Sequence, residues 1–155
     1  MTTDYLVASL PTVAFELPAP LSWDDFTARA GGDARVQKLL ARFAELETQL
    51  KNAQAFARVG QTDWDRPTES LSLYWRNRIL AAFQEKDVAK RETLLDRIWW
   101  DAAGELTAPT APLGEGALAT YAVRLRIALK RSRISTDAGN AAFDRLTAET
   151  KITFS

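Results

Sequence analysis

The sequence predicts an all-α fold in a single domain spanning residues 1–155, on three observations. Apolar residues recur at helical spacing, most clearly between residues 33 and 59. Serine, aspartate and glycine stand where such stretches begin and end, as helix caps do. A chain of 155 residues that is 46% hydrophobic and 26% charged has the composition of one globular domain.

The first segment, residues 1–21, is predicted to be an extended arm. Tyr5 and Val7 favour strand-like backbone, and the three prolines between residues 11 and 20 exclude a continuous helix. A short helix should then begin at Ser22, which forms an S-x-x-D capping pattern with Asp25. Two glycines at 31 and 32 should end it.

A long helix is predicted over residues 33–59, with Asp33 as its N-cap and Gly60 just beyond its end. Its apolar residues alternate in spacing between three and four, which is the pattern of a heptad seam. The seam consists of Val36, Leu39, Phe43, Leu46, Leu50, Ala53 and Ala57.

A helix this long needs a long partner, and residues 68–101 are the predicted one. Thr68 can cap it, and a kink or a new cap at Asp87 can interrupt it. The connection between Gly60 and Pro67 is short, so the two segments are predicted to form a long antiparallel helical hairpin.

The remaining elements are an internal linker and two further packed helices. Residues 104–116 contain three glycines and two prolines and are the predicted linker. Helices are expected over residues 117–133 and 137–150, separated by Ser135, Thr136 and Asp137.

The missing residue types exclude most familiar active sites. Without cysteine there is no disulfide, thiolate zinc site or thiol nucleophile, and without histidine there is no Ser-His triad or imidazole metal ligand. The chain is therefore predicted to be non-catalytic and to need no cofactor. Its 20 basic and 20 acidic residues give zero net charge, which argues against a general nucleic-acid or membrane-surface binder.

Neither a membrane span nor a signal peptide is expected. No apolar run approaches the roughly 20 residues that a spanning helix needs. The apolar stretch from Tyr5 to Leu10 follows Asp4 rather than a basic segment. A cytoplasmic protein is predicted.

Three motifs suggest chemistry only weakly. Asp63 and Asp65 could ligate magnesium, but no phosphate-binding loop accompanies them, and a polar loop explains them better. The run Gly114–Gly116 resembles a phosphate loop but carries a repelling glutamate. The tryptophans and neighbouring aromatic residues could stack on nucleic acid, but their helical spacing favours core positions, with Trp99 in the core and Trp100 at an interface.

A basic run in the helix of residues 117–133 is the strongest candidate for a binding site. Five bases occur there without an acid: Arg124, Arg126, Lys130, Arg131 and Arg133. They either pair with acids of the same protein or, together with Trp100, bind an acidic partner protein, with nucleic acid as a third alternative.

The string YLVASLP at residues 5–11, followed by Ser22 and Phe26, resembles a bacterial family encoded beside the subunits of vacuolar/archaeal-type (V/A-type) rotary ATPases. Two further stretches are similar to that family. They are residues 75–78 with 95–100, and residues 118–127 with Gly139 and Phe143.

That family in turn resembles a reduced form of the helical, funnel-like cap that joins the membrane rotor ring to the central stalk of these ATPases. The resemblance implies a non-catalytic subunit or assembly factor of a proton- or sodium-translocating complex, bound to other protein subunits and to the membrane only through them. The alternatives are a stand-alone helical adaptor or regulator and, less favoured, a small magnesium-dependent enzyme using Asp63 and Asp65.

Overall fold

The computed structural model describes residues 2–62 and 65–154; within these ranges it describes the side chains up to residue 135 and those of Asp137 and Arg145. Every regular element in this part of the chain is a helix, which confirms the all-α prediction. The elements are α1 (Thr3–Ser9), α2 (Trp23–Ala30), α3 (Asp33–Ala41), α4 (Ala44–Val59), α5 (Leu73–Ala82), α6 (Val88–Ala103), the 3₁₀ turn η1 (Gly104–Leu106) and α7 (Glu115–Phe154).

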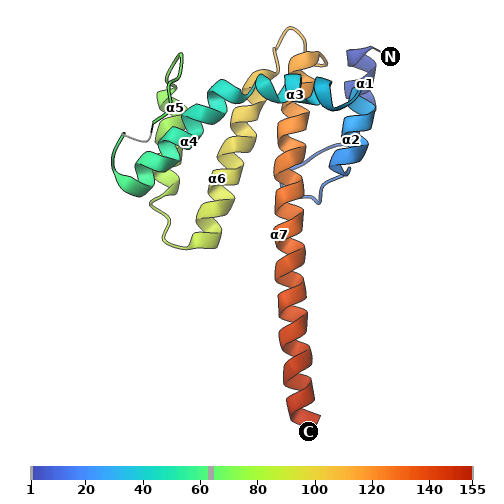
Figure 1. Ribbon diagram of the computed structural model, residues 1–155, viewed down its shortest axis with the longest axis vertical. Coiled ribbons are helices and arrows are strands. Elements are labelled where there is room, and N and C mark those ends of the chain that lie inside the picture. Colours follow the sequence, from blue (N-terminus) through green and yellow to red (C-terminus); the bar gives the residue numbers. More distant parts are fainter. Residues whose placement is uncertain (1, 63–64, 155) are drawn as a thin grey trace.

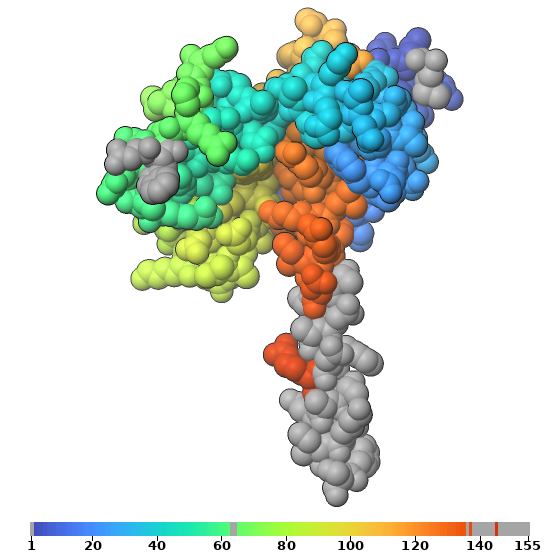
Figure 2. Space-filling view, in the orientation of Figure 1, coloured from blue at the N-terminus to red at the C-terminus, as the bar shows by residue number. Residues whose placement is uncertain are grey.

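The first half of α7 is the centre of the fold (Figure 1). The helices α1 and α2 lie on one side of it and α6 and then α5 on the other, while α3 and α4 run across from one group to the other. The second half of α7 continues past the other helices. Figure 2 shows the surfaces of the neighbouring helices enclosing the first half of α7.

Two hydrophobic clusters meet on α7. One contains Phe43, Trp75 and Trp100 and uses the face of α7 that carries Val123. The other is built from α1, α2 and α3 against the face that carries Leu125. Alanines fill many of the buried positions between them, which lets helices approach α7 closely on both faces.

The predicted extended arm is wrong for residues 3–9, which form α1. The Thr2 hydroxyl caps the helix by accepting from the backbone N–H of Tyr5, and Leu6 and Leu10 are buried four residues apart. Capping and burial therefore outweigh the strand preference of Tyr5 and Val7. Residues 11–21 lie outside helices, as predicted.

The predicted helix 33–59 divides at Arg42 and Phe43. Its seam is largely buried as expected, but the first part of the seam packs in the cluster around α1–α3 and the later part in the cluster around α5 and α6. A straight helix cannot direct one stripe into two separate cores, so the chain turns between α3 and α4. Its end at Gly60, with φ of 70°, is confirmed, and Gly32 rather than Asp33 is its N-cap.

The predicted partner helix 68–101 is two helices. Ser72, rather than Thr68, caps α5, because the Ser72 hydroxyl accepts from the N–H of Trp75. Residues 83–87 then reverse the chain, and Asp87 caps α6 as the sequence indicated.

The predicted antiparallel pairing of this segment with 33–59 is also wrong. Contacts advance in the same direction along α4 and α5, because Gln49 accepts from the N–H of Ser72, while Arg76 stacks on Phe56 further along both helices. Polar side chains of α4 hold the chain before α5 alongside it, so α5 starts near the beginning of α4. Antiparallel pairing occurs instead between α5 and α6 and between α6 and α7, as the ion pairs Arg78–Asp101 and Lys130–Asp96 show.

The two predicted helices 117–133 and 137–150 are one continuous helix in α7. Serine, threonine and aspartate are cap residues only where the backbone leaves the helical conformation, and no proline occurs here to force it out. The side chains of Phe143 and Leu146, predicted for the last helix, lie outside the described residues. The predicted linker 104–116 contains η1 and a series of turns.

Candidate functional site

The five predicted bases of α7 divide into two groups in the structure. Arg124 faces the interior: its Nε donates to the backbone carbonyl of Trp100 at 3.1 Å, and its guanidinium lies over the Trp100 ring. Burial lowers the pKa of Arg124, against the attraction of Asp101, with the repulsion of Arg97 lowering it further. Arg124 is thus a structural residue and not a surface base.

The prediction that Trp100 lies at an interface is wrong. Trp100 is 5% exposed and packs edge-on against Phe15, which comes from the segment between α1 and α2. Trp99, which was assigned to the core, is only partly buried, and its indole Nε1 donates to Gln54 of α4 at 2.7 Å. Adjacent residues point to different sides of a helix, and the fold covers the Trp100 side with Phe15, which sequence periodicity does not reveal.

Two of the bases bind a single acid of α6. The Nζ of Lys130 donates to Asp96 at 2.5 Å, and Arg131 reaches the other carboxylate oxygen of Asp96 at 3.4 Å. Arg131 also stacks on Phe15 at 4.1 Å. Because the side chain of Asp96 is only 12% exposed, its charge requires this pairing.

The other two bases are less engaged. Arg126 lies 3.8 Å from a carboxylate oxygen of Glu47 on α4, at the limit of an ion pair, and its side chain is 41% exposed. Arg133 is exposed and forms no ion pair with any described residue. The prediction that the bases pair with the protein's own acids is therefore true for Lys130 and Arg131, partly true for Arg126, and not for Arg133.

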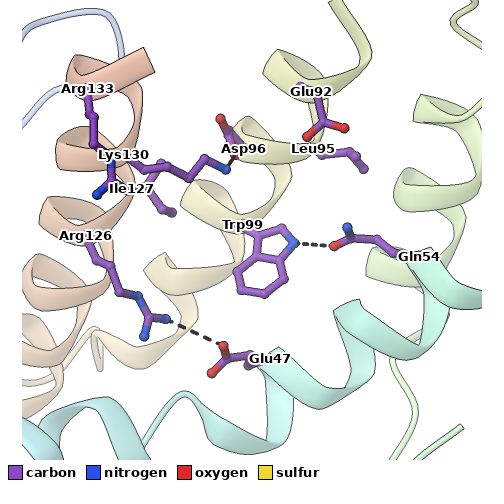
Figure 3. A pocket seen from close by; sticks show the side chains of 10 residues that line it. All are labelled: Glu47, Gln54, Glu92, Leu95, Asp96, Trp99, Arg126, Ile127, Lys130 and Arg133. Carbon is purple, nitrogen blue, oxygen red and sulfur yellow. Dashed lines mark hydrogen bonds and ion pairs between the residues drawn. The ribbon is translucent and has the colours of Figure 1, made fainter. Parts of the chain in front are cut away.

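Arg126, Lys130 and Arg133 form a stripe along one side of α7, at helical spacings of four and three, called the basic ridge below. On one side of the ridge lies a pocket of about 340 Å³ between α4, α6 and α7 (Figure 3). Leu95, Trp99 and Ile127 give this α4/α6/α7 pocket its apolar part.

Acids and bases are balanced in the α4/α6/α7 pocket. Glu47, Glu92 and Asp96 line it together with the three bases of the ridge. Figure 3 shows Lys130 directed at Asp96 and Arg126 directed at Glu47 across the pocket. The pocket is a surface of mixed charge in which the protein neutralises most of its own basic side chains.

Sequence reasoning missed the acids of this pocket. Asp96 stands between Leu95 and Ile98 in the apolar stripe of α6, and an acid at such a position indicates a buried partner of opposite charge. Glu47 gives no comparable signal, because its place opposite Arg126 depends on how α4 crosses α7.

The other sequence candidates do not form a chemical site. Asp63 lies outside the described residues, and Asp65 is exposed. Among the residues whose placement is described, no group of three or more acids lies close enough together to hold a metal ion. Trp75 is buried and its indole donates to Glu105, so it is not part of an exposed stacking platform.

Glu115, from the phosphate-loop-like run, is a structural residue at the start of α7. It accepts from the Thr3 hydroxyl and from Arg35, which tie α1 and α3 to α7. Burial alone raises the pKa of Glu115, but the hydrogen bonds from Thr3 and Arg35 and the charges of Arg35 and Arg42 outweigh it and lower the pKa below 4.5.

No helix among the described residues combines the length and apolar character that crossing a membrane requires. Comparisons with models of known families, with curated proteins and with solved structures found no match to this chain.

Proposed function

We propose that this chain is a non-catalytic, helical protein-binding subunit or assembly factor that docks on an acidic protein surface through the basic ridge. The observation that carries the proposal is the incomplete neutralisation of the ridge. Arg133 has no ion-pair partner among the described residues, and Arg126 is only loosely paired. Unpaired arginines on a rigid helix favour association with carboxylates in two-point contacts.

The resemblance of residues 5–11 to the family encoded beside V/A-type ATPases makes the proteins of that complex the first partners to test. Attachment of this kind places the protein at the membrane only through the complex. The helical architecture and the lack of cysteine and histidine agree with a structural role in such an assembly.

The test is reconstitution with purified V/A-type ATPase stalk proteins, followed by size-exclusion chromatography and a titration at low and high salt. We expect a complex that weakens as salt rises. Reversing both Arg126 and Arg133 to glutamate should weaken it by about tenfold or more at low salt and reduce its salt dependence.

The matched control reverses two exposed bases outside both hollows beside the ridge, Lys86→Glu with Lys90→Glu, and should bind nearly as the wild type does. Equal affinity of the ridge variant and the control variant, with unchanged helical circular dichroism, contradicts the role of the ridge. Failure to bind any of the ATPase proteins, with salt-sensitive binding to another protein, favours the stand-alone adaptor. Binding to arbitrary nucleic acid that the ridge variant loses assigns the ridge to nucleic acid.

A further inference from the structure

A second hollow lies on the other side of the basic ridge, between α2, α3 and α7. Its volume is about 570 Å³. Trp23 of α2, Leu40 of α3 and Leu129 of α7 provide its apolar lining, and all three are only partly buried. The fold therefore leaves an indole and two leucines accessible beside three cations.

The charges around this α2/α3/α7 hollow differ from those of the pocket across the ridge. Arg126, Lys130 and Arg133 line both, but no acid is among the residues that line the α2/α3/α7 hollow. The acids that balance the ridge, Glu47 and Asp96, belong to the α4/α6/α7 pocket. One side of the ridge is thus internally balanced, and the other presents positive charge next to apolar surface.

We propose that the α2/α3/α7 hollow takes a bulky apolar side chain from an acidic segment of a partner protein, while the basic ridge binds the flanking carboxylates. The proposal rests on the proposed function and specifies the chemistry of the partner. A purely acidic surface satisfies the ridge but leaves Trp23, Leu40 and Leu129 hydrated. A purely apolar one buries the guanidinium groups without partners, which is costly. An acidic amphipathic segment satisfies both.

Apolar anchors that enter a hollow beside charged groups dominate the affinity of many interfaces, and arginine and tryptophan are frequent there. Trp23 is suited to receive such an anchor because it is held in place by Phe26, whose ring centroid is 5.5 Å from its own. Leu129 belongs to α7 and Leu40 to α3, so the lining rests on helices and not on loops.

Two labelled helical peptides of equal length and equal negative charge test the proposal. One carries leucines on one face among glutamates, and in the other those leucines are alanines. Fluorescence anisotropy with the full chain should show the leucine peptide binding at least about tenfold more tightly, since burying one large apolar side chain supplies that factor. Leu129→Gln should remove most of the difference between the peptides. Val88→Gln, at an exposed apolar position outside the hollow, should leave it intact.

Equal binding of both peptides, lost on reversal of Arg126 and Arg133, overturns the apolar anchor and leaves the proposed function standing. Absence of binding by either peptide, when ATPase proteins still bind through the ridge, also overturns it. A complex of the intact partner that Leu129→Gln weakens as much as it weakens the leucine peptide supports the proposal. Vesicles of anionic lipid that bind through Trp23 and Leu129, when neither peptide does, assign the hollow to a membrane surface instead.

Discussion

Replacing Gly116 by alanine should destabilise the fold, although alanine is the better helix former. Gly116 is the second residue of α7, where it packs under the 3₁₀ turn η1. A Cβ atom at this position lies 2.0 Å from the backbone carbonyl oxygen of Leu106, whereas Cβ contacts below 3.0 Å are essentially never found. The two backbone segments therefore have to separate by at least about 1 Å.

The magnitude follows from what that separation disturbs. Leu106 packs against both hydrophobic clusters, so its carbonyl group cannot move without loss of contact. The Thr120 hydroxyl, which donates to the carbonyl of Ala103 at 2.8 Å and contacts Thr107 at 2.7 Å, joins the same two segments. Overpacking costs about 1–3 kcal/mol, and alanine returns at most about 1 kcal/mol of helix propensity. With the strained hydrogen bonds included, we expect a net loss of about 2 kcal/mol in the free energy of unfolding.

The assay is thermal and urea unfolding followed by circular dichroism. A loss of about 2 kcal/mol lowers the melting temperature of a chain of this size by roughly 4–8 °C. Ala89→Gly is the matched control, because Ala89 is exposed and is the second residue of α6. It should lose only about 0.5–1 kcal/mol, the propensity term alone. A melting temperature of Gly116→Ala equal to or above that of the wild type would refute the close approach of Leu106 to α7.

Three more substitutions test individual contacts. Thr120→Val keeps the side-chain shape but leaves the carbonyl of Ala103 without its donor, so urea unfolding should show a loss of about 1–3 kcal/mol. Ser72→Ala should cost about 1 kcal/mol because it removes the N-cap of α5, whereas Thr68→Ala should change the unfolding midpoint little; the reverse order would restore the sequence-based assignment of the helix start. Glu115 has a lowered pKa, so its contribution to stability is present above its ordinary value of 4.5 and is lost as pH falls through the lower folded value. The difference in melting temperature between wild type and Glu115→Gln should therefore shrink as pH falls below 4.5, and a difference independent of pH contradicts the assigned ion pair.

Local chemistry in the sequence was sufficient for the fold class and for several helix ends. Ser22 and Asp87 cap helices, and Gly31 and Gly60 end them with positive φ, because each depends only on hydrogen bonds and dihedral angles within a few residues. The apolar seam from residue 36 to 53 was largely buried as expected, because its periodicity marks one side of a helix wherever that side packs.

The tertiary structure decided which core each stretch of that seam enters, and so the turn between α3 and α4 and the direction of α5. It also decided that Trp100 is covered by Phe15 while Trp99 borders a pocket. The basic ridge itself was visible in the sequence, but its neutralisation was not. Lys130 and Asp96 are 34 residues apart, and their pairing follows from the antiparallel packing of α6 on α7, which periodicity within one helix does not encode.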